Sequence, residues 1–224
     1  MIVAIRFWEM RALRGISLMA TKRQALRNFP GVTFSKLLGT GRGETFTPRD
    51  ADPHIWGLLA VFQDESALKI FDESSLVKSW GGAPNFSADL TPIASQGKWA
   101  GLSPFASEVH PSKEGPVAAI TRARIKPSEA VQFWRETPPV TASLKRASGL
   151  LGAIGIGEAP IGLQGTFSLW ESGADLRAFA YGSPAHQRAI ELTQSRNWYS
   201  EELFARFHVL RAEGILGGRT ISAK

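Results

Sequence analysis

Apolar positions follow two periods along the chain. Short apolar or alternating runs bounded by Gly and Pro predict strands, and apolar residues three or four positions apart predict helices. The first half is predicted to contain strand 3–8, helix 12–28, strand 32–38, strand 55–62, a helix starting at residue 66 and a strand around Trp99. The first helix is expected to bury a face with Ile16, Met19 and Leu26, and Pro30 ends it.

The second half repeats that order of strands and helices. Pro127 opens a helix that the pair Pro138-Pro139 is expected to break. The other predicted elements are strand 117–124, a helical piece to about residue 147, strands 150–156 and 163–170, helices 174–180 and 183–199, and strand 203–210. Alternation in the last strand places Phe207 and His208 on opposite faces.

Local similarities indicate an internal duplication. Five residues of the first half match five of the second at one constant offset: Gly57, Phe62, Leu68, Lys69 and Phe71 fall on Gly165, Trp170, Leu176, Arg177 and Phe179. Each half then forms a βαββαβ, ferredoxin-like unit, and two such sheets can pack face to face into a barrel. We predict an α+β protein with a first repeat at 1–105, a connector at 106–115 and a second repeat at 116–224. Two unrelated α+β halves are the alternative.

Composition narrows the class of protein. The chain has 224 residues, 43% of them hydrophobic, and no cysteine, which excludes disulfides, thiolate metal sites and thiolate catalysis. Neither an apolar run long enough to span a membrane nor a signal peptide is recognised, so a cytoplasmic protein is expected.

The net charge of +6 comes from scattered basic residues. Their densest group lies in the first predicted helix and comprises Arg11, Arg14, Lys22, Arg23 and Arg27. This group forms either a solvated face or a face that approaches anionic lipid or an acidic protein. No motif predicts a nucleic-acid partner.

Several common catalytic motifs are missing. The sequence has no G-x-S-x-G elbow and no G-x-x-x-x-G-K-[ST] loop, which disfavours an α/β-hydrolase and a P-loop enzyme. Gly39, Gly41 and Gly43 follow a strand but precede a polar loop instead of a helix. They are therefore interpreted as a turn.

Among the four histidines, His186 has the most distinctive context. Ser183 and Pro184 are a typical N-cap and first helical residue, so His186 falls in the first turn of a helix and points inward with an apolar stripe. A helix N-terminus disfavours the charged imidazolium, which keeps the ring available to a metal. A buried histidine with only a structural role is the alternative.

Most of the chain resembles the spheroidene monooxygenase family. The resemblance runs through FSKLLGTGRGETFTP, IWGLLAVFQD, GKWAGLSPF and PVAAITRARIKPSEAVQFWRETPPV, and it is most specific in SP-x-H followed by WYSEELFARF. It implies an enzyme of the dimeric α/β barrel superfamily that oxidises C-2 of an acyclic carotenoid with O2. It also implies a haem b cofactor and an external electron donor such as ferredoxin.

The resemblance assigns roles to five residues. His186 would bind the haem iron, because no thiolate exists and a phenol is the less common ligand. Arg188 would hold a haem propionate, and Trp99 would wall the pocket. Arg122 and Lys36, which are also candidates for the propionates, would act as catalytic donors to bound oxygen.

Other functions are compatible with the same fold. They are a haem enzyme with peroxidase-like or aldoxime-dehydratase-like activity and a non-enzymatic ligand-binding barrel. An apolar substrate also suggests peripheral contact with the inner membrane. A homo-oligomer is an alternative to a monomer.

Overall fold

The computed structural model describes residues 1–105, 114–158 and 163–223. The first half contains β1 (Ile2–Glu9), α1 (Ala12–Thr21), α2 (Arg23–Arg27), β2 (Val32–Gly41), a 3-10 turn at Pro48–Asp50, β3 (Ala51–Phe62), α3 (Glu65–Asp72), α4 (Ser75–Lys78) and β4 (Phe86–Gly97). The second half contains β5 (Val117–Ile125), a 3-10 turn at Pro127–Glu129, α5 (Ala130–Lys145), β6 (Leu150–Gly157), β7 (Leu163–Trp170), α6 (Gly173–Gly182), α7 (Pro184–Arg196), β8 (Tyr199–Leu216) and β9 (Arg219–Ala223).

Eight of the strands close into an antiparallel barrel. The strand order is β4-β1-β3-β2-β6-β7-β5-β8-β9, and an additional pairing of β4 with β8 closes the ring. The order β4-β1-β3-β2 of the first half returns as β8-β5-β7-β6 in the second. Two ferredoxin-like units therefore form one barrel within a single chain, which confirms the predicted fold class. The repeat boundaries stay a prediction, because residues 106–113 of the connector lie outside the described part.

The two seams between the sheets differ in length. At one seam β4 and β8 pair from Phe86 with Gly214 to Gly97 with Leu203. At the other, β2 and β6 pair over three residues each, from Gly39 with Gly157 to Gly41 with Gly155. The short seam leaves much of β6 without a partner from β2, so the barrel wall is most open there.

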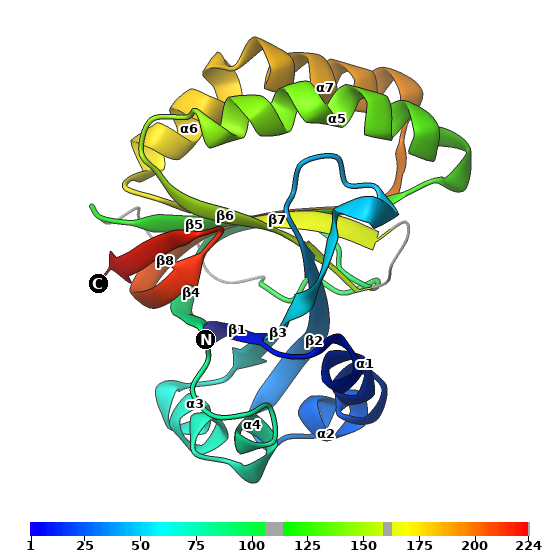
Figure 1. The fold of residues 1–224 in the computed structure, drawn as a ribbon. Coiled ribbons are helices and arrows are strands. Elements are labelled where there is room, and N and C mark those ends of the chain that lie inside the picture. The colour runs from blue at the N-terminus through cyan, green and yellow to red at the C-terminus, as the bar shows by residue number, and fades with distance from the viewer. Residues whose placement is uncertain (106–113, 159–162, 224) are drawn as a thin grey trace.

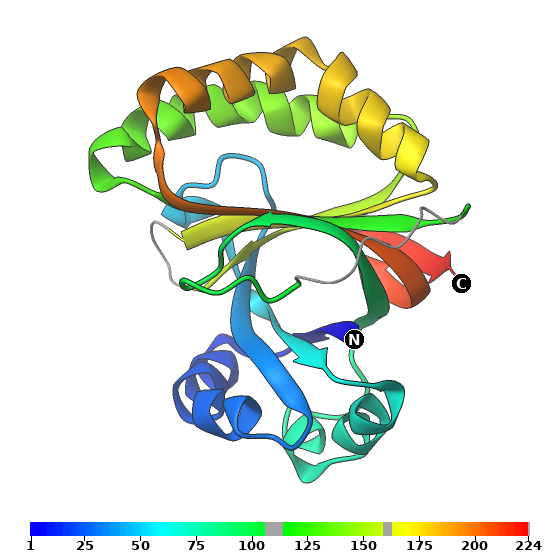
Figure 2. The same ribbon diagram turned by 180° about the vertical axis from the view of Figure 1, so that it is seen from behind.

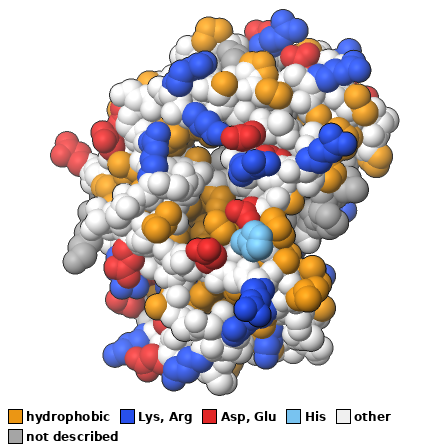
Figure 3. All heavy atoms as spheres, in the orientation of Figure 1, with side chains coloured by type: hydrophobic (Ala, Val, Ile, Leu, Met, Phe, Trp, Pro, Cys, Tyr) orange, Lys and Arg blue, Asp and Glu red, His pale blue; other side chains and the backbone are white. Residues whose placement is uncertain are grey.

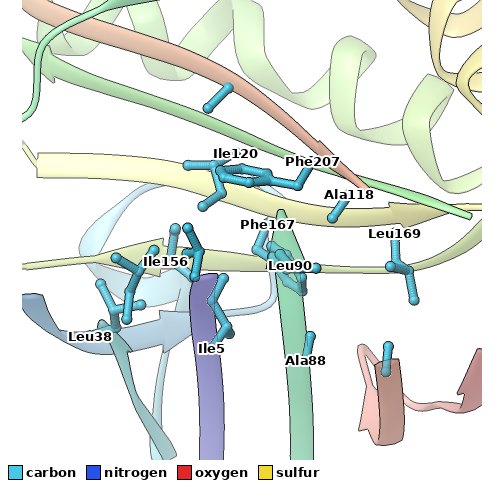
Figure 4. Packing of buried hydrophobic residues seen from close by; sticks show 14 of the residues in the cluster. Ile5, Leu38, Ala88, Leu90, Ala118, Ile120, Ile156, Phe167, Leu169 and Phe207 are labelled. Atoms are coloured by element: carbon cyan, nitrogen blue, oxygen red, sulfur yellow. The ribbon is translucent and has the colours of Figure 1, made fainter. Parts of the chain in front are cut away.

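The barrel interior is filled by apolar side chains from both sheets (Figure 4). Phe7 of β1, Phe86 of β4 and Phe167 of β7 are in mutual contact, with ring centroids 6.0 to 6.5 Å apart. All three are almost fully buried. The interior is thus a shared core that joins the halves, and it is not a channel.

Each outer face of the barrel carries its own layer of helices. α1 to α4 cover the first sheet, and α5, α6 and α7 cover the second on the opposite side (Figures 1 and 2). No helix in the described residues is long and apolar enough to cross a membrane.

The helices of the first half pack directly on bulky side chains. The outer face of the first sheet presents Trp8, Leu58 and Phe62, which are buried under α1 to α4. The guanidinium of Arg6, 2% exposed, bonds Asp72 of α3 at 2.9 Å and Asp89 of β4 at 2.7 Å. This buried charge is paired twice, as an interior cation must be.

Two predicted helices differ from the observed ones. The predicted helix 12–28 is divided into α1 and α2, and Ile16 is exposed while Gly15 and Leu18 face inward. Gly15 is required there, because an added Cβ would lie 2.1 Å from Nε1 of Trp56. The predicted break at Pro138-Pro139 is wrong: α5 continues through both prolines, which are exposed.

The strand predictions were wrong in three places. A strand was expected around Trp99, but β4 ends at Gly97. Trp99 lies beyond β4 and forms one isolated bridge with Leu102. Gly39 and Gly41 belong to β2 at the short seam, not to a turn. The sequence reasoning also missed β9, a short strand that pairs with the end of β8.

Candidate active site

Three residues singled out from the sequence meet at one end of the barrel interior. Lys36 of β2 bonds Glu158 at 2.6 Å, and Arg122 of β5 bonds the same carboxylate at 3.3 Å. The indole N–H of Trp99 also donates to Glu158. Arg122 bonds Glu201 of β8 as well, and its guanidinium lies 5.6 Å from the Trp99 ring centroid. These five residues are called the carboxylate cluster below.

Glu201 ties the segment after β4 to the barrel. Its carboxylate accepts backbone N–H bonds from Ala100 at 3.0 Å and Gly101 at 2.7 Å, besides the bond from Arg122. Burial acts to raise the pKa of Glu201, but the bond from Gly101, the bond from Arg122 and the bond from Ala100 together outweigh burial and lower the pKa. Glu201 is therefore ionised at neutral pH.

The charges of the cluster balance. Two cations, Lys36 and Arg122, face two carboxylates, and Arg122 is 3% exposed. Among the side-chain atoms of these five described residues, Nε of Arg122 is buried without a hydrogen-bond partner. The predicted cations are thus held by the protein's own carboxylates, an arrangement typical of a structural clamp.

His186 and Arg188 lie elsewhere, on α7 in the outer helical layer. Arg188 is 70% exposed and pairs with Glu136 of α5 at 3.4 Å. Arg122 shares the barrel-facing side of β5 with Ala118 and Ile120, whereas α7 covers the opposite side of the second sheet (Figure 1). The structure therefore places Lys36, Trp99 and Arg122 on the barrel side of the second sheet and His186 and Arg188 in the helical layer on its other side.

The environment of His186 keeps its imidazole neutral. Ser183 caps α7 as expected, and its hydroxyl accepts the backbone N–H of His186 at 3.3 Å. The ring is half-buried against Phe179, with centroids 5.2 Å apart, and burial lowers the pKa of His186. Nδ1 is buried and has no hydrogen-bond partner among the described residues. A neutral ring with an unpartnered nitrogen is suited to a metal.

Small side chains form the outer face of the second sheet beneath α5 and α7. Paired positions across the strands carry Gly155 opposite Thr166, and Thr166 opposite Thr121. Ala119 and Ala123 flank Thr121 on the same face of β5. Thr121 is exposed, although β5 lies in the middle of the sheet. The helices therefore do not cover this part of the sheet as they cover the first sheet.

The helices above this face carry further unpartnered groups. The indole nitrogens of Trp134 on α5 and of Trp198, just after α7, are buried without a hydrogen-bond partner in the described residues. Buried polar groups normally find a partner, so orphans in one layer point to a missing ligand or to water. We call this region, between α5 and α7 and the face with Thr121 and Thr166, the helix–sheet layer.

A cleft of about 500 Å³ opens at the short seam. Its wall includes Gly155 and Thr166 of the helix–sheet layer, Thr141 and Leu144 of α5, and apolar residues from both halves, namely Phe7, Ile55, Ile154 and Ile215. Acidic and basic side chains stand around it, among them Glu9, Asp52, Arg42 and Lys145. Figure 3 shows this hollow with hydrophobic side chains inside and charged ones around it.

The sequence reasoning missed Glu158, Glu201, Thr121 and Thr166. The two glutamates gave no signal, because ion pairs far apart in the chain need the fold to bring them together. The threonines gave a weak signal. They belong to a run of small residues in the central strands β5 and β7, where bulky side chains are the norm.

Two comparisons with sequence relatives cover most of the chain. It is 38% identical over 91% of its length to spheroidene monooxygenase of Rhodobacter capsulatus, covering 86% of that protein. It is 40% identical over 85% of its length to spheroidene monooxygenase of Rubrivivax gelatinosus, covering 73% of that protein. No protein-family model matches the chain.

Solved structures with a similar fold include aldoxime dehydratases. One matches 93% of this chain and 81% of its own with a TM-score of 0.59 and 10% sequence identity. Another, in complex with butyraldoxime, matches with a TM-score of 0.54 and 10% identity. At such identities the likeness concerns the fold alone.

Glu201→Gln tests the clamp through pH. Because the pKa of Glu201 is lowered in the folded protein, its ionised form stabilises the fold above the ordinary carboxyl pKa. That contribution disappears as the pH falls through the lowered pKa. We expect the variant to lose about 1–3 kcal/mol of unfolding free energy at pH 7 and progressively less on acidification, measured by urea unfolding.

Glu213→Gln is the matched control, since Glu213 is 59% exposed. The unfolding free energy of this variant should stay close to that of the wild type at every pH. A loss for Glu201→Gln that is the same at pH 7 and at pH 3 would contradict the clamp.

Proposed function

Because this chain belongs to the spheroidene monooxygenase family, we propose that it inserts oxygen from O2 at C-2 of an acyclic carotenoid, with haem b bound in the helix–sheet layer. The supporting observation is a region of small, partly exposed sheet residues beneath helices that hold a neutral, unpartnered histidine. Bound haem would supply the activation of O2 that a closed-shell hydrocarbon needs.

The residues of the helix–sheet layer suit a flat apolar ligand. Ala123 and Thr166 stand where the first sheet presents Trp8 and Leu58, and Ala119, Thr121 and Gly155 around them are small as well. The position of Phe62 stays bulky, because Trp170 occupies it and packs on Phe179 of α6. The two halves thus share a topology but differ in the volume they leave between sheet and helices. His186 is the proposed iron ligand, through whichever ring nitrogen faces the layer.

Other residues of this layer have proposed supporting roles. Arg188 is exposed and can exchange Glu136 for a propionate, because that ion pair lies at the surface. Thr121 and Thr166 face the layer with hydroxyl groups that would serve as hydrogen-bond donors to a ligand held there. Arg122 and Lys36 point into the barrel, so we propose that they act as positioning residues of the clamp instead of as donors to oxygen.

The cleft is the proposed binding site for one end of the carotenoid. Its apolar wall reaches Gly155 and Thr166, which also belong to the helix–sheet layer, so a polyene end in the cleft lies beside the proposed haem. The filled barrel cannot take the chain, and a volume of about 500 Å³ holds only part of a C40 polyene. The remainder of the substrate would extend out of the cleft.

The reaction also requires partners. Hydroxylation by O2 places one oxygen atom in the substrate and reduces the other to water, consuming two electrons and two protons. An external donor such as ferredoxin would supply the electrons, because no dinucleotide fingerprint occurs in the sequence. A substrate that resides in a bilayer further requires contact with a membrane surface.

His186→Ala tests the haem ligand. Haem-reconstituted protein should show a Soret band that His186→Ala loses or strongly shifts, while His54→Ala, at an exposed histidine, keeps it. Burial lowers the pKa of His186, so protons compete less for its ring than for an ordinary histidine, and the band should persist to correspondingly lower pH. An identical band in wild type and His186→Ala would contradict the assignment.

Pigment analysis in cells that make acyclic carotenoids separates the carotenoid oxygenase from other haem enzymes of this fold. The proposal requires a product that carries oxygen at C-2. Haem binding with unchanged pigments would instead favour peroxidase-like or aldoxime-dehydratase-like chemistry.

Ile215→Glu tests the cleft. Ile215 is 59% exposed at the cleft wall, so a carboxylate there should spare the fold but disfavour an apolar chain. We expect carotenoid conversion to fall about tenfold, equivalent to about 1.4 kcal/mol, with an unchanged Soret band.

Ile70→Glu on α3, where Ile70 is 62% exposed and outside the cleft wall, is the matched control. It should keep full conversion. Equal conversion by the two variants would remove the cleft from the substrate path.

A further inference from the structure

The surface formed by α1 and α2 combines exposed aliphatic side chains with a purely basic charge. Leu13 is 83% exposed and Ile16 54% exposed, and both project from α1 three residues apart, on one side of the helix. Soluble proteins commonly expose single aliphatic residues, but here two lie together among cations. We call this surface, residues 11–27, the α1–α2 face.

The charge of the α1–α2 face is one-sided. It carries Arg11, Arg14, Lys22, Arg23 and Arg27, and the sequence contains no acidic residue between Glu9 and Glu44. Arg14 donates to the carbonyl of Ser79 at 3.1 Å. None of the five pairs with a carboxylate among residues that the structure describes. The cations are therefore available to an external anionic surface.

The face is supported by rigid packing beneath it. Leu18 and Leu26 are buried, and Gly15 lies directly against the indole of Trp56 on β3. Gly15 leaves no room for a side chain of its own, so α1 is held close to the sheet while Leu13 and Ile16 remain outside. The exposed pair is thus a fixed feature of a packed helix and not a consequence of fraying.

We propose that the α1–α2 face docks on an anionic lipid bilayer, with Leu13 and Ile16 entering the interface and the five cations lying against the headgroups. Aliphatic residues flanked by cations are the pattern of interfacial helices. An acidic protein such as a ferredoxin would also meet the charge, but it gives no reason to leave Leu13 almost wholly exposed.

The docked face would bring the cleft close to the membrane. Glu9 lines the cleft, and α1 begins at Ala12, three residues further along the chain. Ile55 also lines the cleft, while its neighbour Trp56 packs on α1. The use of this closeness, to supply a carotenoid from the bilayer to the cleft, rests on the proposed function. The docking itself does not depend on the proposed function.

Vesicle co-sedimentation of the full chain tests the docking. Wild type should bind vesicles of phosphatidylglycerol and phosphatidylcholine, bind pure phosphatidylcholine weakly, and lose binding as salt rises. Leu13→Gln with Arg23→Gln and Arg27→Gln should weaken the partition coefficient at least about thirtyfold, because each cation near the surface contributes substantially.

The matched control is Ile70→Gln with Lys69→Gln and Lys78→Gln, three exposed positions on α3 and α4. It also removes one aliphatic side chain and two cations, and it should bind vesicles like the wild type. Equal binding by the two triple variants would overturn the docking, as would a wild type that binds an acidic ferredoxin through this face but no vesicles.

The two proposals fail in different ways. Vesicle binding needs neither haem nor turnover, so docking can hold in a protein with no oxygenase activity. Conversely, full conversion of detergent-dispersed carotenoid by a triple variant that no longer binds vesicles would leave the oxygenase proposal intact and support a purely delivery role for the face.

Discussion

Closure of the barrel around a filled core determines where this protein can bind anything. Phe7, Phe86 and Phe167 meet inside it from three strands of the two halves, so the interior is packed like any other protein core. Ligand space is left only where the wall is incomplete or where a helical layer stands off its sheet. The described structure has the first at the short β2–β6 seam, and the proposed haem site is of the second kind, beneath α5 and α7 where Thr121 remains exposed.

The two halves use one topology for two purposes. In the first, Trp8, Leu58 and Phe62 fill the space under the helices, and the buried Arg6 fixes α3 to the sheet. In the second, Trp170 keeps the bulky position of Phe62, but Thr166 and Ala123 replace Leu58 and Trp8, and buried nitrogens of the described residues remain without partners. A duplicated fold can thus keep one copy as a scaffold and leave volume for a ligand in the other.

Periodicity predicted most of the strands, and residue matches at one constant offset predicted the duplication. The barrel followed from the two, because each apolar sheet face needs a partner and the matching halves supply one another. Periodicity failed where a contact distant in sequence decides the local outcome. Gly15 faces inward because Trp56 fills the space above it, and Gly39 and Gly41 extend a strand because β6 pairs with them. The ion pairs of Glu158 and Glu201 likewise exist only after folding, so the clamp could not be found from spacing.

The central claim, that haem occupies the helix–sheet layer, is tested most directly by filling that layer. Thr121→Phe places an aromatic ring at an exposed position on its sheet face, and Thr220→Phe does the same at an exposed position of β9. Haem titration followed by absorbance should show at least about tenfold weaker binding for Thr121→Phe, with Thr220→Phe and the unfolding midpoints close to wild type. Equally tight haem binding by both variants would contradict the account.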